Sequence, residues 1–550
     1  MPVVEVKLWD LARLVKEELS ISTLSNLFTA LKAEVEELSE DTVIYEASHD
    51  RPDLFSAEGL SRALSFVLGV RSPSKYAVSH SDIYLDVSNA PDYRPYAFIA
   101  IVRNVELDDE SIRQLFQLQE KLHLTYCGDR EFVSIGLYDL DKVKPPIRYV
   151  EVRNAEFRPL NESVTMALDD ILKKTEKGLK YAHLVKKSKY PLLRDSEGEV
   201  LSFPPIINCD DNKVTEDTKN VLIDVTGTEP QLMAKVLNII TTSVAERGGR
   251  GGAIIESAKV LGRNGEVIDL APKLEGSVID LKLRNIESLV GIKLNFNEVR
   301  DMLPRMGYLI EKEDTDTLKV WVPPYRVDVI GEVDLIEDIT IVYGYERLPA
   351  EVLPPTHFGG VSPIEYFSSI IRDLMMGLGF EEVVNFMLVN SELLADISPE
   401  AYVKLANPKM KTYSAVRNSM IPSLLLSVIE NADLHQQLKI FEVGDVVKVT
   451  DDGAYVSQRY LGFAVYGDNV TLTDGLVTIK SLLTALGINY ELRQGEHEVF
   501  IKGRTAKVVV SGSEVGILGE VHPEYLVKYR LVWPLVVGEL NLSKLISEFK

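Results

Sequence analysis

The chain is 550 residues long, 45% of them hydrophobic, and its formal net charge is −23. One hydrophobic core does not support a chain of this length, so the sequence predicts three to five domains of roughly 100–200 residues each. The excess of carboxylates excludes a protein that coats itself with nucleic acid by bulk electrostatics, because phosphate binding needs Lys and Arg. Any contact with RNA must come from a local basic patch or from a partner.

Two cysteines occur, Cys127 and Cys209, and neither belongs to a CxxC motif. His123 stands near Cys127, but further zinc ligands are missing nearby, so the sequence favours two buried thiols in a reducing compartment over a zinc site. The opening MPVVEVKLWDLARLVKEEL is charged too early for a signal peptide, and no apolar run approaches about 18 residues. We expect a cytoplasmic protein that does not use a membrane.

The first predicted module spans residues 1–88. A strand leads into a helix from Leu8 to Leu19. A later helix has Ser56 as its N-cap and ends at Gly69, because Ser accepts from free backbone N–H groups and Gly tolerates the left-handed cap. The stretch 71–92 is rich in Ser, Asp and Pro and reads as a boundary or linker.

The remaining chain divides into three further predicted units. Residues 89–272 alternate strand-like runs (FIAIVRNV, FVSIGLYDL, VLIDVTGT) with helical runs (ESIRQLFQLQEKLHL, EPQLMAKVLNIITTSVAE). Residues 273–350 contain the helix–Gly–strand pattern LNFNEVRDMLPRMGYLI, and LPAEVLPP then marks an interdomain break. Residues 355–550 read as antiparallel strands with flanking helices. The fold class is therefore multidomain α+β.

An acidic stretch, PPYRVDVIGEVDLIEDITIVYGYER (323–347), raises the question of whether it holds a cation. Its carboxylates are Asp328, Glu332, Asp334, Glu337 and Asp338. If a helix begins near Gly331, Asp334, Glu337 and Asp338 stand at i, i+3 and i+4 and share one face. Two readings stay open at this point. One is a solvated helix face with Arg326 as counter-ion, and the other is a hard-cation site, where oxygen ligands without His or Cys favour Mg²⁺ or Ca²⁺.

Several stretches spread over nearly the whole chain resemble one family. They are HDRPDLFSAEGLSRAL (49–64), IDVTGTEP (223–230), PPYRVDVIGEVDLIEDITIVYGYERLP (323–349), LANPKMKTYSAVRNSMIPSLLLSVIEN followed by FEVGDVV (405–447), and GILGEVHPE (516–524). Their order and spacing also match. Together they look like the β subunit of phenylalanyl-tRNA synthetase, in its shorter archaeal/eukaryotic-type form.

This resemblance implies a cytoplasmic aminoacyl-tRNA synthetase subunit that works in an α2β2 heterotetramer. The α subunit of such an enzyme carries the aminoacylation site, where ATP and phenylalanine are used to charge tRNA(Phe), and Mg²⁺ is the implied cofactor. The four predicted units then correspond to an N-terminal module (1–88), a B3/B4-type editing and tRNA-binding domain (89–272), a B5 domain with a Mg²⁺ site (273–350), and a degenerate class II synthetase core (355–550).

The last unit lacks the residues that an active class II synthetase core needs. Neither an FRxE-like strand motif nor a Gly-rich segment ending in Arg is present; the nearest residues are Arg417 and Glu442. We therefore expect no catalytic residue for aminoacylation in this chain.

The resemblance also shifts the interpretation of the acidic stretch toward a Mg²⁺ site. The acidic positions of the family's B5 motif map onto Asp328, Asp334, Glu337 and Asp338. Glu332 falls outside this set and is expected to be solvated. Because the metal would lie in a different domain from the catalytic-like fold, its expected role is structural or interfacial.

The 89–272 unit resembles the family's editing module, which removes tyrosine wrongly attached to tRNA(Phe). An apolar pocket rejects an added hydroxyl only by about 10², so a second site must recognise that hydroxyl with polar groups. Asp224 and Thr226 alternate onto one face of a strand and suit this task, with Ser202 as a further candidate. Water is the expected nucleophile, because no Ser-His-Asp or Cys-His arrangement can be read. A role for Asp224 and Thr226 as turn formers before Gly227 stays open.

Two basic segments are further candidates for RNA contact. Arg247 and Arg250 flank or occupy the run GGRGG (248–252), where glycines in a tight connection are the commoner explanation. Lys121, His123 and Arg130 lie in KLHLTYCGDREF. A second class of function also stays open: a non-enzymatic scaffold that binds tRNA and assembles the synthetase without editing.

Overall fold

The computed structural model describes residues 2–19, 24, 27–314, 316–354 and 357–549. The chain forms two compact units, Met1–Glu351 and Val352–Lys550, and the break between them falls inside the predicted interdomain segment LPAEVLPP. Among the helices described, none is long and apolar enough to cross a membrane.

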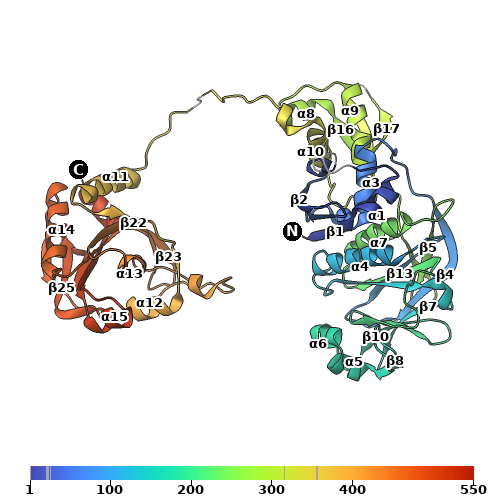
Figure 1. Ribbon diagram of the computed structural model, residues 1–550, viewed down its shortest axis with the longest axis horizontal. Helices are drawn as coiled ribbons and strands as arrows, with labels where there is room; N and C mark the ends of the chain where they lie inside the picture. Colours follow the sequence, from blue (N-terminus) through green and yellow to red (C-terminus); the bar gives the residue numbers. More distant parts are fainter. Residues whose placement is uncertain (1, 20–23, 25–26, 315, 355–356, 550) are drawn as a thin grey trace. The chain divides into compact units, whose positions relative to one another are not determined.

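The first unit is built on a large mixed sheet (Figure 1). In the described part of the chain its strand order is β12-β11-β10-β7-β4-β14-β5-β13-β6, with β15 paired to β14. The bounds are β4 (Val78–Asn89), β5 (Tyr96–Arg103), β6 (Val133–Asp139), β7 (Ile147–Val152), β10 (Tyr190–Arg194), β11 (Val200–Phe203), β12 (Ile207–Asn208), β13 (Asn220–Gly227), β14 (Ile254–Leu261) and β15 (Val267–Ala271).

Helices α4 (Asp109–Leu124) and α7 (Pro230–Ala245) cover one face of this sheet. Alternate residues of β13, Val221, Ile223 and Val225, belong to the core under these helices, whereas Leu222 belongs to a separate core on the opposite face. This alternation follows from the two-residue period of a strand. It places Asp224 of β13 on the face opposite α7.

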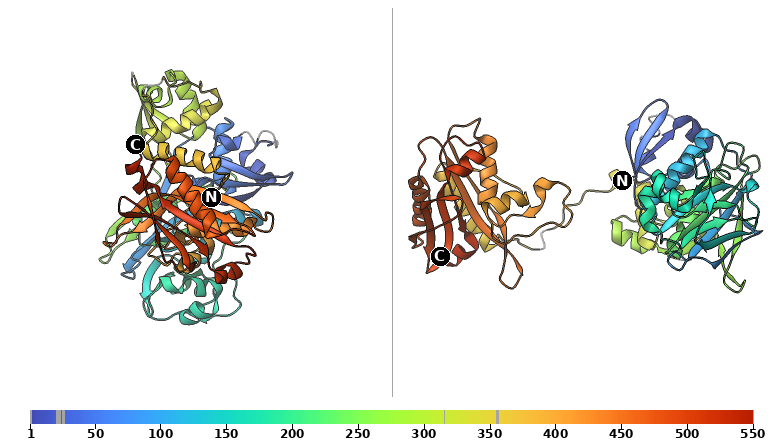
Figure 2. Two further views of the ribbon diagram at one scale, coloured as in Figure 1. Left: turned by 90° about the vertical axis from the view of Figure 1, so that its left-hand side faces the viewer. Right: turned by 90° about the horizontal axis from the view of Figure 1, so that it is seen from below.

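A small helical subdomain interrupts the sheet between β7 and β10. It consists of β8 (Glu156–Phe157), β9 (Met166–Ala167), α5 (Leu168–Lys174), α6 (Glu176–Tyr181) and the 3₁₀ turn η3 (Ala182–Leu184). It has its own core, which includes Leu168, Ile171 and Tyr181. Two views place α5 and α6 at the end of the first unit that lies farthest from α8 and α9 (Figures 1 and 2).

The N-terminal module packs on the α4/α7 side of the large sheet. It comprises the antiparallel sheet β1-β3-β2 (Val3–Lys7, Thr42–Ala47, Ala33–Leu38), α1 (Leu8–Val15), η1 (Pro52–Leu54) and α3 (Ala57–Val67). Its apolar residues form one continuous core with those of α4 and α7. The predicted N-cap is confirmed, since Ser56 Oγ accepts from Gly59 N–H, and Gly69 has φ +74° after the helix end.

A buried ion pair joins this module to the end of α7. The Arg247 guanidinium donates to both carboxylate oxygens of Asp10, at 2.7 and 2.8 Å, and to Glu58 at 2.6 Å. All three side chains are almost fully buried. Arg247 therefore holds α1, α3 and α7 together, and the predicted phosphate contact for this residue is wrong.

A third module in the first unit carries the acidic stretch. Its antiparallel sheet is β16-β18-β17 (Ser277–Lys282, Thr317–Val322, Leu309–Glu313), with α8 (Leu283–Val290), α9 (Phe296–Met302), η4 (Leu303–Met306), α10 (Glu332–Tyr343) and η5 (Tyr345–Arg347). The predicted helix start is confirmed, because α10 follows Gly331 as its N-cap residue. Gly307 has φ +87°, as expected for a residue after a helical segment.

The second unit is a seven-stranded sheet with helices on both faces. The strand order in its described residues is β19-β22-β23-β27-β26-β25-β24, antiparallel except at β19/β22. These strands are Glu381–Glu382, Leu438–Val449, Tyr455–Tyr466, Leu535–Asn541, Ser513–Val521, Phe500–Val510 and Glu491–Gln494. The other elements are α11 (Pro363–Gly377), β20 (Leu388–Val389), α12 (Ser391–Ile397), η6 (Lys411–Tyr413), β21 (Ala415–Val416), α13 (Ile421–Asn431), α14 (Leu472–Ala485), α15 (Pro523–Lys528), α16 (Leu542–Leu545) and η7 (Ile546–Glu548).

Two sequence-based expectations about the first unit need correction. The stretch 71–92 is not a linker throughout, because β4 (Val78–Asn89) lies inside the large sheet between β7 and β14. Its alternating Ile83, Leu85 and Val87 pack against the core, and the neighbouring Ser and Asp residues obscured this pattern. The predicted helix from Leu8 to Leu19 ends at Val15, where Lys16 adopts a left-handed cap with φ 63°.

The Arg247 contact yields a testable prediction about stability. Arg247→Met should lower the free energy of unfolding of the first unit by roughly 3–5 kcal/mol, because it leaves Glu58 buried without its cation and leaves Asp10 with only the half-exposed Arg13. Urea denaturation followed by circular dichroism measures this change. Arg250→Met is the matched control: Arg250 is exposed, so its replacement should stay within about 0.5 kcal/mol. Equal effects of the two variants would contradict the structural role of Arg247.

Candidate functional site

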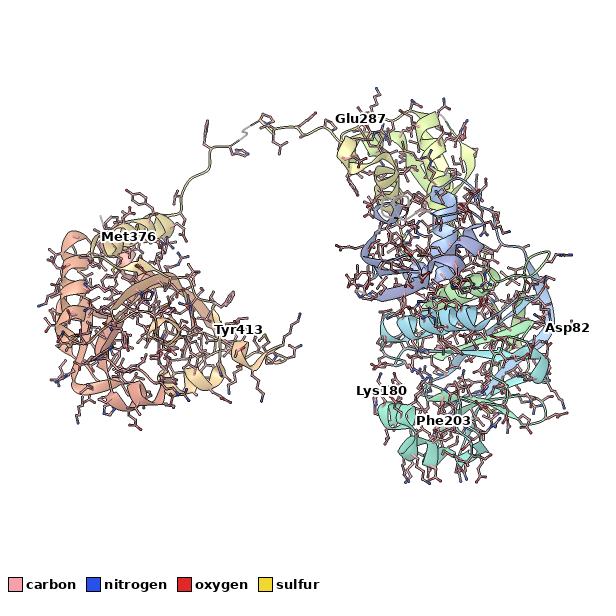
Figure 3. The ribbon with its side chains drawn as sticks, viewed as in Figure 1. Asp82, Lys180, Phe203, Glu287, Met376 and Tyr413 are labelled. Atoms are coloured by element: carbon pink, nitrogen blue, oxygen red, sulfur yellow. The ribbon has the colours of Figure 1, made fainter. Side chains whose placement is uncertain are left out.

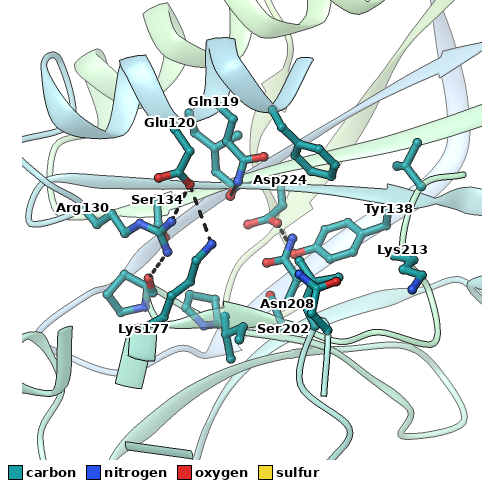
Figure 4. Close-up of a pocket in the computed structure, with 18 residues that line it drawn as sticks. Gln119, Glu120, Arg130, Ser134, Tyr138, Lys177, Ser202, Asn208, Lys213 and Asp224 are labelled. Atoms are coloured by element: carbon teal, nitrogen blue, oxygen red, sulfur yellow. Dashed lines mark hydrogen bonds and ion pairs between the residues drawn. The ribbon is translucent and has the colours of Figure 1, made fainter. Parts of the chain in front are cut away.

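A cavity of about 560 Å³ lies in the large-sheet domain, within the size range of small-molecule sites. Residues from the two ends of the strand order line it: Ser202 of β11 and Asn208 of β12 on one side, Ser134 and Tyr138 of β6 on the other. The sheet therefore curls so that its ends face each other across the cavity. Gln119 and Glu120 of α4 close a further side (Figure 4).

Asp224 lies at the buried end of this cavity. It sits on β13 between β5 and β6, directly opposite Gly136 of β6. The Tyr138 hydroxyl donates to Asp224 Oδ1 at 2.5 Å (Figure 4). A Cβ at position 136 would lie 2.1 Å from both of these oxygens, so the glycine provides the space in which the carboxylate meets the phenol.

The charge state of Asp224 is poised near neutral pH. Burial raises the pKa of this carboxyl, while the Tyr138 hydroxyl and the nearby Arg94 oppose the rise, and the result is a pKa of about 7. Among the described residues, no Lys or Arg forms an ion pair with Asp224. A carboxylate of this kind, in a cavity and with a strongly shifted pKa, is typical of functional sites.

The structure separates the three predicted editing residues. Asp224 and Ser202 both line the cavity, and the Ser202 hydroxyl is buried without a hydrogen-bond partner among the described residues. Thr226 does not line the cavity. Its side chain is fully buried, its hydroxyl is hydrogen-bonded to the Ser134 hydroxyl at 2.8 Å, and its carbonyl accepts from Arg94. Thr226 thus supports the wall of the cavity.

The opposite end of the cavity is charged. Glu120 accepts from the Arg130 guanidinium at 2.7 Å and has Lys177 at 3.9 Å (Figure 4). Burial alone would raise the pKa of Glu120, but His123, Arg130 and Lys177 lower it to about 2, so this carboxylate is ionised at neutral pH. Arg130 also donates to the Pro205 and Ile206 carbonyls, which ties the segment before β6 to the β11–β12 connection.

Two of the residues considered for RNA contact lie inside the protein. The His123 ring is buried, its Nε2 accepts from Ile135 N–H at 2.9 Å, and burial together with Arg130 lowers its pKa to about 4 despite Glu120. The Arg130 side chain is almost completely buried as well. The prediction that these two residues contact RNA at the surface is therefore wrong. Both predicted buried thiols, Cys127 and Cys209, are confirmed as buried and free.

Sequence reasoning missed several residues of the cavity, namely Gln119, Glu120, Tyr138 and Lys177. The alternation of FVSIGLYDL places Gly136 and Tyr138 on one face of a strand, which was a usable signal. Their position opposite Asp224 depends on the pairing of β6 with β13, about 90 residues apart in the chain, which local sequence patterns do not reveal.

Two protein cations, Arg326 and Lys32, pair with part of the acidic stretch. The Arg326 guanidinium is buried and donates to Asp328 at 2.8 and 2.9 Å and to Asp338 at 2.6 Å. The Tyr308 hydroxyl also donates to Asp338. Burial tends to raise the pKa of Asp328, but Arg326 and Arg51 hold that pKa below its usual value.

Lys32, from the N-terminal module, supplies the second cation. Its ammonium lies 2.7 Å from Glu337 and 3.6 Å from both Asp338 and Asp50. Burial alone would lower the pKa of Lys32, but the three carboxylates more than compensate and raise it. The ammonium therefore stays charged and links the N-terminal module to α10.

The remaining carboxylates of the stretch also have protein partners. Asp334 accepts from the Ile330 and Gly331 N–H groups at 2.7 and 2.8 Å and caps α10. Glu332 accepts from Lys282 N–H and from the Asn285 side chain, so the expectation that it is solvated is wrong. It joins α10 to β16 and α8.

A shared metal ion does not fit these carboxylates in the arrangement shown. Within the described residues, no group of three or more His, Cys, Asp or Glu side chains is placed to hold a metal. Asp328 and Asp338 face Arg326, and Asp334 faces backbone donors. None of the residues described donates a hydrogen bond to Asp338 Oδ1, which faces the Lys32 ammonium.

In the second unit, Arg417 is not available to hold a phosphate group. It forms an ion pair with Glu442 at 2.8 Å, and both side chains are almost fully buried. Its Nε donates to the Asp445 carbonyl. The two residues nearest to a class II nucleotide clamp in sequence thus neutralise each other inside the fold.

Three family models match successive parts of the chain: the B3/4 domain at residues 94–261, the tRNA synthetase B5 domain at 279–345 and the phenylalanyl tRNA synthetase beta chain CLM domain at 350–542. The phenylalanine–tRNA ligase beta subunit of Thermofilum pendens is 43% identical over 99% of this chain and 98% of its own length. That of Pyrococcus furiosus is 38% identical over 99% and 100%.

A solved structure matches the first unit. An N-terminal fragment of the phenylalanyl-tRNA synthetase beta subunit from Pyrococcus horikoshii is 38% identical and superimposes with a TM-score of 0.59, covering 62% of this chain and all of the fragment. The domain set defines a subunit of an aminoacyl-tRNA synthetase, which is a ligase. The chain belongs to the family of phenylalanine–tRNA ligase beta subunits.

The position of Lys32 yields a testable prediction about Mg²⁺. A divalent ion bound by Asp334, Glu337 and Asp338 would have to displace the Lys32 ammonium, so Lys32→Ala should bind Mg²⁺ more tightly than the wild-type chain. Isothermal titration of the full chain with MgCl₂ measures both affinities. Asp334→Ala with Glu337→Ala, added to Lys32→Ala, should remove the gain. Wild-type affinity as high as that of Lys32→Ala would show that the ammonium does not compete for this place.

Proposed function

We propose that this chain supports the charging of tRNA(Phe) with phenylalanine by an α partner and itself hydrolyses tyrosine wrongly attached to tRNA(Phe). The first part rests on the family to which the chain belongs. The second rests on one observation: a buried carboxylate in a cavity, Asp224, that already binds a phenol hydroxyl, that of Tyr138.

The Tyr138 contact shows which ligand chemistry Asp224 suits. A carboxylate accepts through two oxygens, and here Oδ1 is used by the protein's own phenol. No described residue donates a hydrogen bond to Oδ2. The phenol of a bound tyrosyl group is a donor of the same kind as Tyr138, and the free Ser202 hydroxyl can assist it.

Discrimination against phenylalanine follows from desolvation. A ligand that enters the cavity displaces water from Asp224, and tyrosine returns a hydrogen bond whereas phenylalanine does not. Sites built to bind a substrate hydroxyl reject the analogue that lacks it by about 10⁴–10⁵. The cavity thus prefers tyrosine, whereas an apolar aminoacylation site prefers phenylalanine. The two sites together separate the two amino acids.

The hydrolytic step uses water as its nucleophile. Among the described residues that line the cavity, none is His or Cys, and Ser202 has no base bonded to it. Water attacks the carbonyl carbon of the ester, and the bond to the terminal ribose oxygen breaks, releasing tyrosine and tRNA. The chain's contribution is to hold the tyrosyl group and to place its ester toward the solvent-reaching end of the cavity.

The family also indicates the partners. We propose an α2β2 assembly in the cytoplasm in which the α subunit binds ATP and phenylalanine. The second unit supports a partner contact, since Val384 is 90% exposed and Phe386 is 73% exposed, and both border a cavity of about 750 Å³. Mg²⁺ at Asp328, Asp334, Glu337 and Asp338 stays a prediction, to be decided by the titration above.

The alternative is a scaffold that binds tRNA and assembles the enzyme without editing. Both hypotheses predict that the chain alone does not charge tRNA. They differ in deacylation, which only the editing hypothesis requires.

The first prediction concerns Asp224. The chain with its α partner should hydrolyse Tyr-tRNA(Phe) well above the buffer rate, and Asp224→Ala should reduce kcat/KM by roughly 10–100-fold, as expected for a lost hydrogen bond to a charged group. Release of labelled tyrosine measures the rate. Asp141→Ala, an exposed carboxylate after the end of β6, is the matched control and should retain wild-type activity. Hydrolysis no faster than in buffer would support the scaffold instead.

The second prediction concerns pH. Because Asp224 has a pKa of about 7, the ratio of Tyr-tRNA(Phe) to Phe-tRNA(Phe) hydrolysis should rise as pH increases from 6 to 8 and the carboxylate loses its proton. The uncatalysed rate is subtracted at each pH. In Asp224→Asn the ratio should be low and independent of pH.

The same shift makes a statement about stability. The folded state binds this proton more tightly than the unfolded chain, so the free energy of unfolding falls as pH rises from about 4 to 7. Asp224→Asn should therefore unfold at a higher temperature than the wild type at pH 8. If Asp224→Asn were less stable than the wild type at pH 8, the claim that Asp224 carries a buried, uncompensated charge at that pH would be wrong.

A further inference from the structure

A lysine-rich segment adjoins the cavity and has no role in the site described so far. Residues 173–189 contain seven lysines and a single carboxylate, Glu176, in a chain whose formal net charge is −23. The segment covers the end of α5, all of α6 and η3. Sequence composition alone shows this run, but a charged run is usually only a solvated surface. Its position in the fold is what distinguishes it.

The segment is a rigid platform. Thr175 ends α5 and caps α6, accepting from Gly178 N–H at 3.0 Å. A Cβ at Gly178 would lie 1.9 Å from the Ile171 carbonyl oxygen, so the two helices meet at a distance that only glycine allows. Tyr181 is buried in the core of the subdomain. The lysines of α5 and α6, Lys173, Lys174, Lys177 and Lys180, therefore extend from a backbone that is held by these contacts.

Most of the lysine charge faces solvent. Apart from Lys177, which is partly covered, the lysines of the segment are exposed, and Lys180 is labelled on its outer surface in Figure 3. Four of the seven have an acidic neighbour, at 3.2–3.9 Å: Lys174, Lys177, Lys180 and Lys189. Within the described residues, Lys173, Lys186 and Lys187 form no ion pair. Exposed pairs at such distances are weak and are easily exchanged for a phosphate.

Lys177 connects this surface to the cavity. It lines the cavity beside Glu120, and its side chain is 42% exposed, whereas Asp224 at the other end is 2% exposed (Figure 4). A ligand whose tyrosyl group reaches Asp224 therefore leaves the cavity past residues that reach solvent, with Lys177 among them. Lys180 follows one helical turn after Lys177 on α6, and its side chain is exposed.

We infer that residues 173–189 bind the phosphates of the acceptor end of tRNA, and so deliver the aminoacylated 3′ terminus to the cavity. The inference rests on the proposed hydrolysis for its purpose, but not for its chemistry. Phosphate binding requires local cations, and in a strongly acidic chain a rigid cationic platform at the edge of a cavity meets that requirement. Lys177 and its neighbours are positioning residues, because they would contact phosphates and not the ester that is hydrolysed.

The test compares two triple variants of the full chain in complex with its α partner. Lys173→Gln, Lys180→Gln and Lys187→Gln change the segment, while Lys259→Gln, Lys293→Gln and Lys312→Gln remove the same charge from exposed positions elsewhere in the first unit. Fluorescence anisotropy measures the affinity for uncharged tRNA and for an acceptor-stem minihelix at several KCl concentrations. Thermal unfolding checks that both variants fold.

The segment variant should bind about tenfold more weakly at low salt, and the slope of log K against log[KCl] should fall by about 2, since each single-strand phosphate contact contributes about 0.7. The minihelix should show the same loss. In Tyr-tRNA(Phe) hydrolysis, KM should rise and kcat should stay unchanged. The control variant should match the wild type in all three measurements.

The outcomes separate this inference from the proposed function. Hydrolysis with an unchanged salt slope in the segment variant would overturn the phosphate surface and leave editing intact. A reduced slope in a chain that hydrolyses nothing would support the surface and remove editing. Equal losses in both triple variants would show only a net-charge effect and would overturn the inference.

Discussion

Burying a charged side chain is costly unless the fold supplies a counter-charge, and much of this structure is arranged around that requirement. Arg247 pairs with Asp10 and Glu58, Arg326 pairs with Asp328 and Asp338, and Arg417 pairs with Glu442. The Arg247 contacts join segments that are far apart in the chain, whereas Arg326 pairs with residues 2 and 12 positions away. Arg247 holds the N-terminal module on α7, and Lys32 holds the same module on α10. The modules of the first unit are thereby kept in one arrangement around the large sheet.

Asp224 departs from this pattern, which is why the cavity stands out as a site. Its partner is a neutral phenol, and the described residues offer it no ion pair, so burial raises its pKa to about 7. Such a group lowers the stability of the folded state above neutral pH. The space for this arrangement depends on Gly136, because any side chain there would overlap both Asp224 and Tyr138.

The acidic stretch shows how far local spacing can be trusted. The i, i+3, i+4 rule correctly placed Asp334, Glu337 and Asp338 in one helix, α10, beginning after Gly331. It did not reveal their partners, since Lys32 lies 305 residues before Glu337, and Arg326 approaches through a buried turn. Glu337 and Asp338 meet the Lys32 ammonium, Asp338 also meets Arg326, and binding of Mg²⁺ at this stretch stays a prediction. The same limitation applied to Arg247, which reads as a surface residue beside a glycine-rich loop and is a buried ion-pair partner.

Local patterns in the sequence determined the class of fold, most helices and strands, the caps at Ser56 and Gly307, and the break near residue 350, because these depend on periodicity and on backbone preferences within a few residues. They also placed Asp224 on a strand. Only the tertiary structure decided that Asp224 meets Tyr138 and shares a cavity with Ser202 while Thr226 supports the wall, because that depends on the pairing of β6 with β13 and on the curl of the sheet. The charges show the same division between what the sequence determines and what the fold decides. The number of charges can be read from the chain, but their partners, and therefore their pKa values, depend on which distant segments the fold brings within a few ångströms.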